Sequence, residues 1–407
     1  MSTEYLSEEQ LAGFDKYKYS SKDTSPVSKY ITHPFWNQCV KLVPLWVAPN
    51  VLTFASFLCL VFSLVLLSLY DTKLVASSRH YPDSPPIPNW VWVVAGVCQF
   101  LSHTLDGIDG KQARRTQTSG PLGELFDHGV DSWSTMFLSV ALFSVFSRDT
   151  KDFGEGVFTM YWVLWCILIC FIASHWEKYN TGVLFLPWGY DVVQIMMTII
   201  YLLTGIFGVN VWKGTYFGWL EFRKVFLIAL YVGSYGFTLP HTFYNVYRSY
   251  KDRSGKMHPF TEAMRPLFST IFLFLVATMW VHGSTYDILE EEPRIVFWAI
   301  GTMFSNITCR LIVSQMSSTR AELFNGLLIP FMLVPAISLA VPIGIYELYL
   351  TWALAIFLTI AHLHYGVCVV RQMCDHFNIN CFTITKRPPK KKEITPQSAS
   401  NIEMDIA

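Results

Sequence analysis

The chain has 407 residues, and its 30 basic and 30 acidic side chains give a formal net charge of zero. Of its residues 52% are hydrophobic and only 15% are charged, and its mean hydropathy is +0.35. These values exclude an ordinary soluble domain. We therefore expect an all-α integral membrane protein with no nucleic-acid partner.

The first 47 residues are expected to form a cytosolic N-terminal segment. The opening residues, MSTEYLSEEQLAGFDKYKYS, are polar and lack the apolar core of a signal peptide. Residues 28–46 mix lysines with Phe35, Trp36 and Trp46, which is typical of a helix that lies in the membrane interface. An irregular cytosolic segment is the alternative interpretation.

A polytopic membrane domain is expected over residues 48–372. An apolar run of about 20 residues matches a bilayer-spanning helix at about 1.5 Å rise per residue. Ten such runs predict helices near residues 51–70, 90–107, 129–147, 158–175, 190–208, 224–243, 265–282, 295–314, 323–345 and 349–370. Ten spans put both termini on one side, and the distribution of Lys and Arg makes that side cytosolic.

Residues 373–407 are expected to form a cytosolic tail. From about residue 386 this tail is rich in Lys, Pro and Ser and has no apolar periodicity. Such a composition is typical of a largely disordered segment.

Four aspartates stand beside the second and third expected spans. Asp106 and Asp109 are three residues apart and Asp127 and Asp131 are four apart, so each pair shares one helix face. If the two helices pack together, four carboxylates converge, which is costly near a membrane unless cations neutralise them. Carboxylate ligation suits two Mg²⁺ or Mn²⁺ ions, set about 4 Å apart as a clamp for phosphoryl displacement. The segment 108–128 is expected to be a loop that faces the cytosol.

Small and basic side chains separate the two acidic pairs. Gly110, Ala113 and Gly123 allow close approach of helices and leave room for a flat base or a phosphate. Arg114 can form a forked pair with a phosphate, and Lys111 supplies further positive charge. Together with the acids, these residues predict a nucleotide-diphosphate site.

The complete pattern resembles a known signature. D-x-x-D-G-x-x-A-R, eight residues, and then G-x-x-x-D-x-x-x-D is the arrangement found in the CDP-alcohol phosphotransferases. The stretches KYKYSSKDTSPVSKYITHPFWN (16–37), APNVLTF (48–54), SHWEKYNTG (174–182) and SQMSSTR (314–320) extend the resemblance over nearly the whole chain. They are most similar to the ethanolamine-using members of the eukaryotic choline/ethanolamine branch.

The resemblance implies a reaction. Phosphoethanolamine would pass from CDP-ethanolamine to diacylglycerol, giving phosphatidylethanolamine and CMP, in the endoplasmic reticulum or Golgi membrane and in a homodimer. An enzyme that uses CDP-choline, or both donors, is the nearer alternative. A cation transporter, whose carboxylates would bind the transported ion, is the alternative from another class.

The resemblance also implies roles for individual residues. The four aspartates would hold the two metal ions. Gly110, Ala113 and Gly123 would border the cytidine and ribose, and Asn50 would reach the nucleotide. Arg114 or Lys111 would hold phosphate charge.

Two residues compete for the role of general base. Asp131 fills the last position of the signature. His128 has an imidazole with an unperturbed pKa of about 6.5, which suits neutral pH better than a metal-bound carboxylate. We favour His128. Glu177 and Asp191 are candidates for contact with the ethanolammonium head group, although ordinary charges at helix ends are the alternative interpretation.

Overall fold

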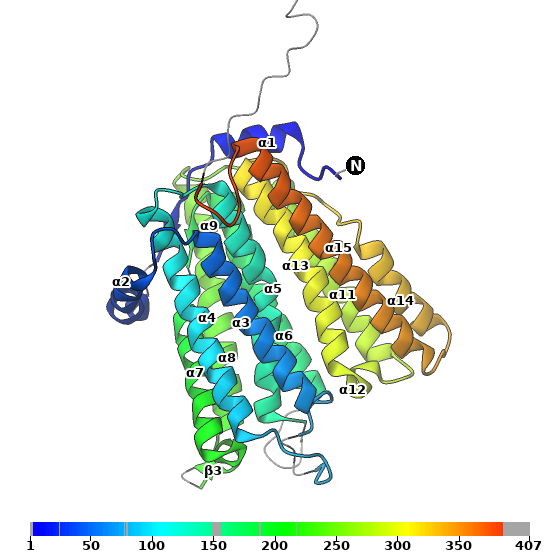
Figure 1. The fold of residues 1–407 in the computed structure, drawn as a ribbon. Coiled ribbons are helices and arrows are strands. Elements are labelled where there is room, and N and C mark those ends of the chain that lie inside the picture. The colour runs from blue at the N-terminus through cyan, green and yellow to red at the C-terminus, as the bar shows by residue number, and fades with distance from the viewer. Residues whose placement is uncertain are drawn as a thin grey trace, which may run out of the picture.

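A computed structural model describes residues 3–23, 25–76, 78, 80–148, 156–186, 189–216 and 218–385 (Figure 1). These residues form a bundle of long helices. Two small pieces of sheet join chain segments, with β1 (Ser21–Lys22) parallel to β2 (Leu184–Phe185) and β3 (Thr215–Tyr216) antiparallel to β4 (Leu220–Glu221). The prediction of an all-α membrane protein is confirmed.

Within the described ranges, eight helical segments are long and apolar enough to cross a membrane. They are α3 (Pro49–Tyr70), α4 (Asn89–Arg115), α5 (Pro121–Phe146), α6 (Val157–Thr181), α7 (Gly189–Phe207), α10 (Phe260–Met264) continued through a 3₁₀ turn η4 (Arg265–Leu267) into α11 (Phe268–Gly283), α13 (Pro293–Ser317) and α15 (Tyr346–Phe377).

The other two expected spans coincide with broken or shorter helices. One consists of α8 (Phe222–Tyr231), a π-helical segment η3 (Val232–Thr238) and α9 (Leu239–Lys251), and the other is α14 (Leu328–Ala340). A 3₁₀ turn η2 (Val209–Trp212) precedes β3, and a short helix α12 (Ile288–Glu291) precedes α13. Each of the ten predicted spans therefore overlaps a helical segment.

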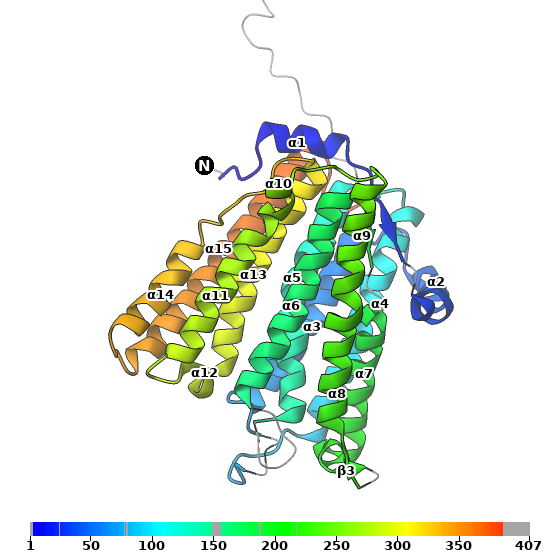
Figure 2. The same ribbon diagram turned by 180° about the vertical axis from the view of Figure 1, so that it is seen from behind.

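Helix α13 lies at the centre of the bundle. In its most apolar window 83% of the residues are buried, because α13 packs against α5, α6 and α15. Aromatic rings fill the contact with α5, where the rings of Phe137 and Trp298 stack with centroids 5.4 Å apart and Trp133 lies 5.7 Å from Trp298. These contacts join the helices α3–α9 to the group α11–α15 (Figures 1 and 2).

Helix α1 (Glu8–Asp15) lies across the end of the bundle at which α15 ends (Figures 1 and 2). A capping box between Ser7 and Gln10 fixes its first turn. The side-chain amide oxygen of Gln372 accepts the backbone N–H of Tyr5 at 2.8 Å, which fastens the N-terminal segment to α15. This helix was not predicted from the sequence.

Helix α2 (His33–Leu42) occupies the stretch in which an interfacial helix was expected, directly after a π-helical turn η1 (Ser28–Thr32). Trp36 and Val40 are buried against Leu52 of α3 and Ile108 of α4. On the outer side, Phe35, Leu42, Leu45 and Trp46 are exposed large hydrophobic side chains. This amphipathic arrangement suits a helix at the membrane interface.

The prediction of a loop over residues 108–128 is wrong. Helix α4 continues to Arg115 and α5 begins at Pro121, so only residues 116–120 connect them. The extension of α4 is held by tertiary contacts, since Gln112 donates to the carbonyl oxygens of Pro44 and Val47 and Arg115 donates to that of Val43. Proline at the first helical position then starts α5.

Helix α15 ends at Phe377, four residues beyond the expected start of the tail at residue 373, and Asn378 then adopts a left-handed conformation with φ of 55°. Residues 378–385, which we call the C-terminal strap, turn back onto α3. The ring of Phe382 lies 5.7 Å from the rings of both Phe54 and Phe126. The expected disorder from residue 386 onwards falls outside the described residues.

Candidate active site

The four aspartates meet where the last turns of α4 approach the first turns of α5. Ligand atoms of Asp106, Asp109 and Asp127 lie within 4.8 Å of one another, and the same holds for Asp127, His128 and Asp131. Asp127 belongs to both groups. The convergence predicted from the three- and four-residue spacings is therefore present in the fold.

Hydrogen bonds from neighbouring helices orient two of these carboxylates. The hydroxyl of Thr53 on α3 donates to Oδ2 of Asp109 at 2.5 Å, and the backbone N–H of Gly110 donates to its Oδ1. The hydroxyl of Tyr190 on α7 donates to Oδ2 of Asp106 at 3.2 Å. Neither hydroxyl was predicted from the sequence, although Thr53 follows Asn50 by three residues and so shares its helix face.

The oxygen atoms of the cluster fit a hard divalent cation. Oδ1 of Asp127 is buried, and no described residue offers it a hydrogen bond. A buried carboxylate oxygen without a partner is costly, and a cation shared between two carboxylate groups removes that cost. Oxygen ligands alone match the preference of Mg²⁺ or Mn²⁺.

His128 stands beside the aspartates with a free ring nitrogen. Its Nδ1 lies 4.0 Å from Oδ2 of Asp127, and its Nε2 lies 3.8 Å from Oε1 of Glu124. Among the described residues no group makes a hydrogen bond to the buried Nε2. The ring packs edge-on against His175, with centroids 5.5 Å apart. The imidazole is thus held by packing, and one of its nitrogens is available to accept a proton.

Glu124 is a member of the site that sequence analysis did not find. It lies in the first turn of α5, four residues before His128, and pairs with Lys178 of α6 and with Tyr17 of the N-terminal segment. Burial, and next the carboxylate of Glu124, raise the pKa of Tyr17 well above its ordinary value. Tyr17 is therefore a neutral hydrogen-bond donor at every physiological pH.

The residues expected around the nucleotide are placed around this cluster. Oδ1 of Asn50 lies 3.6 Å from the position that a Cβ on Gly123 would occupy, and its Nδ2 donates to the carbonyl oxygen of Cys381 at 3.0 Å. Arg114 is exposed, with a guanidinium nitrogen 3.8 Å from a Cβ position on Gly110. Ala113 follows on the same helix and is partly buried.

Two residues near the aspartates of α4 contact helix α2 instead of the cluster. Nζ of Lys111 donates to Oδ1 of Asn37 at 2.8 Å. A Cβ on Gly107 would stand 2.2–2.4 Å from ring atoms of Trp36. Gly107 is therefore required for the packing of α2 on α4, whereas a Cβ on Gly110 or Gly123 would meet its nearest neighbour only at ordinary van der Waals distance.

Glu177 and Asp191 use their carboxylates inside the fold. Glu177 accepts hydrogen bonds from Asn245 at 2.7 Å and Thr242 at 3.2 Å, and so faces α9. Asp191 accepts from Ser28 at 2.5 Å and Thr32 at 2.9 Å, and its other oxygen lies 2.9 Å from Nε2 of His103. These contacts fasten α9 and the N-terminal segment to the bundle.

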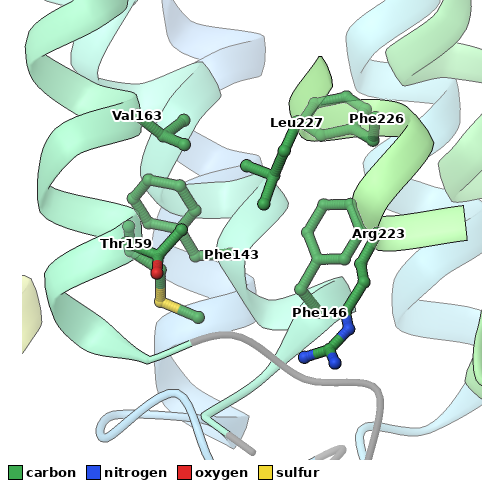
Figure 3. A pocket seen from close by; sticks show the side chains of 8 residues that line it. Phe143, Phe146, Thr159, Val163, Arg223, Phe226 and Leu227 are labelled. Atoms are coloured by element: carbon green, nitrogen blue, oxygen red, sulfur yellow. The ribbon is translucent and has the colours of Figure 1, made fainter. Parts of the chain in front are cut away.

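A small pocket lies far from the aspartates. It is lined by Phe143 and Phe146 near the other end of α5, together with Thr159, Met160, Val163, Arg223, Phe226 and Leu227 (Figure 3). The guanidinium of Arg223 is paired with Glu221 at 2.7 Å. The walls are otherwise mostly apolar, so this cavity lacks the groups that the chemistry of the aspartate cluster requires.

Comparisons with known proteins place the chain among enzymes that carry the same motif. The sequence profile described as CDP-alcohol phosphatidyltransferase matches residues 46–232, which include all four aspartates. Ethanolaminephosphotransferase 1 of Homo sapiens is 47% identical over 384 residues, covering 94% of this chain and 95% of the relative, and that of Mus musculus is 48% identical over the same shares. Choline/ethanolaminephosphotransferase 2 of Arabidopsis thaliana is 30% identical over 94% of this chain and 99% of the relative. On this similarity, and on the signature that its site carries, the chain belongs to the CDP-alcohol phosphotransferase family.

Proposed function

We propose that the protein transfers phosphoethanolamine from CDP-ethanolamine to diacylglycerol, with release of CMP and formation of phosphatidylethanolamine. The observation that carries the proposal is the cluster of Asp106, Asp109, Asp127 and Asp131, with a buried oxygen of Asp127 that the described residues leave without a partner. The names of the relatives support ethanolamine as the head group.

Asp106, Asp109, Asp127 and Asp131 would hold two Mg²⁺ or Mn²⁺ ions. When bound, these ions neutralise the diphosphate and stabilise the charge that develops on the transferred phosphoryl group. Asp127 belongs to both groups of possible ligands. Asn50, Gly110, Ala113 and Gly123 would border the nucleotide, and Arg114, the exposed cation beside Gly110, would pair with phosphate.

His128 is proposed as the general base. Its unpartnered Nε2 can accept the proton of the diacylglycerol hydroxyl while that oxygen attacks the phosphorus bearing ethanolamine. The P–O bond to CMP then breaks, and CMP carries away the electron pair. Asp131 is the alternative base, but a carboxylate that binds a cation holds a proton poorly.

Diacylglycerol would reach the site from the bilayer, because the cluster lies at the ends of membrane-spanning helices. We propose that this end, where α1 and the last turn of α15 also lie, faces the cytosol of the endoplasmic reticulum or Golgi (Figure 1). The excess of Lys and Arg in the segments assigned to that side supports this orientation. We also propose that the protein is a homodimer.

The test is a donor assay with the purified protein in lipid nanodiscs. CMP should be released from CDP-ethanolamine only when diacylglycerol and Mg²⁺ or Mn²⁺ are present, and EDTA should abolish the release. Asp127→Asn should remove turnover, whereas Asp83→Asn, an exposed acid in the loop before α4, should not. Absence of CMP release from the folded, metal-loaded protein would refute the proposal.

A choline-containing donor is the second candidate, because the Arabidopsis relative is named for both head groups. Parallel assays with CDP-choline decide between the donors. We expect a higher kcat/KM for CDP-ethanolamine, and equal values would indicate dual specificity.

A further inference from the structure

One buried cation in the site occupies a set of groups suited to an ammonium ligand. Nζ of Lys178 lies 5.5 Å from the ring centroid of Tyr17 and 5.7 Å from that of Tyr19. The same ammonium is paired with the carboxylate of Glu124, which also accepts the hydroxyl of Tyr17 at 2.6 Å. We call Tyr17, Tyr19 and Glu124 the ammonium box.

The ammonium box is buried at Glu124 and exposed to solvent at Tyr19. The side chains of Lys178 and Glu124 are only 3% and 8% exposed, whereas Tyr19 is 55% exposed. A cation within about 6 Å of an aromatic centroid is attracted to the ring face, and the attraction grows as water is removed. A cationic ligand would therefore enter the box from the solvent-exposed side, next to Tyr19.

The position of the box matches the reach of the donor. Oε1 of Glu124 lies 3.8 Å from Nε2 of His128, whose other ring nitrogen lies 4.0 Å from Asp127. Ethanolamine places only two carbons between its oxygen and its nitrogen. The head group of a donor held at the aspartates must therefore bind within one layer of side chains around them, which is where the ammonium box lies.

We propose that the ammonium box is the head-group subsite for a primary ammonium, and that Lys178 occupies it in the absence of donor. This inference rests on the proposed function. The donor brings both a phosphate and an ammonium. Its ammonium would replace that of Lys178 beside Glu124, and the flexible side chain of Lys178 would turn towards the donor phosphate, so both charges stay paired.

The chemistry of the box favours ethanolamine over choline. A primary ammonium can donate N–H bonds to the carboxylate of Glu124, as Lys178 does, and charge-assisted bonds of this kind are among the stronger ones in proteins. A trimethylammonium has no N–H to donate and is larger. Both head groups would benefit from the rings of Tyr17 and Tyr19, so Glu124 is the residue that discriminates between them.

The first experiment measures binding without turnover. In calorimetric titrations with Mg²⁺ present, the unaltered protein should bind CDP-ethanolamine more tightly than CDP-choline, and CDP, which lacks the head group, is the control. Glu124→Gln should reduce this difference by about tenfold or more, as expected for loss of a charge-assisted hydrogen bond, while the affinity for CDP is kept. An unchanged difference in Glu124→Gln would overturn the proposal.

The second experiment compares the two donors in the transfer assay. Lys178→Met removes the charge and leaves an unbranched side chain of nearly the same length. Neither donor then has to displace an ammonium from Glu124, so the KM for both donors should fall while the preference for ethanolamine, which Glu124 sets, is kept. Lys29→Met is the matched control, because Lys29 lies 5.3 Å from the ring of Tyr30 but is exposed and outside the box. Equal loss of kcat on both donors in Lys178→Met, with unaltered KM, would assign Lys178 to the fold and overturn its role in the box. Failure of the unaltered protein to transfer either head group would refute the proposed function, whereas the titrations would still test the box.

Discussion

Thr53 on α3 donates a 2.5 Å hydrogen bond to Asp109 on α4. Asp109 is 7% exposed, and the backbone N–H of Gly110 donates to its second oxygen. Helix α3 contributes no carboxylate to the cluster, yet it fixes the direction of one. Replacement of a residue that orients a metal ligand in this way commonly lowers metal affinity or activity.

Replacement of Thr53 by valine should weaken metal binding. Valine keeps the shape of threonine but cannot donate to Asp109, and loss of such a bond typically lowers metal affinity by about 10- to 100-fold. The Mn²⁺ affinity, measured by paramagnetic resonance, and the metal concentration for half-maximal activity should both change. Thr53→Ser should restore them, and Thr104→Val, whose hydroxyl donates only to Phe100 of its own helix, is the control. A normal Mn²⁺ affinity in Thr53→Val would contradict this role.

Replacement of Gly107 by alanine should destabilise the contact between α2 and α4. The added Cβ would stand 2.2–2.4 Å from ring atoms of Trp36, and overpacking of this kind typically costs about 1–3 kcal/mol. The midpoint of thermal unfolding in detergent should fall, with faster proteolysis after Lys29 or Lys41. Gly366→Ala on α15, where a Cβ meets no atom within 4 Å, should leave the midpoint unchanged or slightly raised. Equal unfolding midpoints for the two variants would show that Trp36 does not pack closely against Gly107.

Single replacements of His128 and Asp131 should separate a base from a metal ligand. His128→Ala should lose turnover while it keeps its affinity for Mn²⁺, because its Nε2 has no hydrogen-bond partner among the described groups and its removal leaves all four carboxylates. Asp131→Asn should lose Mn²⁺ affinity together with turnover. A general base typically accelerates a reaction by about 10²- to 10⁴-fold, so kcat should fall by that factor in His128→Ala. Substantial turnover in that variant would transfer the role of base to Asp131.

Replacement of Asp191 by alanine should release the N-terminal segment. The change leaves the hydroxyls of Ser28 and Thr32 and the ring of His103 without their acceptor, and unsatisfied buried groups cost about 1–3 kcal/mol each. Limited trypsin digestion should cut at Lys29 sooner than in the unaltered protein. KM should rise equally for CDP-ethanolamine and CDP-choline, because Asp191 supports the segment that carries Tyr17 and Tyr19. A loss confined to one donor would instead support direct contact of Asp191 with the head group.

The spans and the four aspartates could be predicted because their signals are local. A helix places residues three and four apart on one face, so the pairs Asp106–Asp109 and Asp127–Asp131 carry their geometry in their spacing. Glu124 carries no such signal. In the sequence it is an acid in the first turn of a helix, and its partners Lys178 and Tyr17 are 54 and 107 residues away.

The extent of α4 could not be predicted for a related reason. Gln112 and Arg115 have the polarity of loop residues, and they remain helical because they donate to carbonyl oxygens in the segment between α2 and α3. Glu177 and Asp191 show the reverse case. Each has the character of a binding residue in the sequence, and in the fold each carboxylate accepts hydrogen bonds from neighbouring segments.

The contact between Tyr5 and Gln372 spans 367 positions of the chain, and the one between Asn50 and Cys381 spans 331. During translation these contacts can form only after α15 has left the ribosome, long after the aspartate-bearing helices α4 and α5 have been made. Tyr17 follows α1 by two residues, and α1 packs against α13, so we expect Tyr17 to reach Glu124 only after α13 has been made. This part of the active site would then be completed once α13 has been made, and a product that stops before α15 would carry the aspartates but lack the contacts with Gln372 and Cys381.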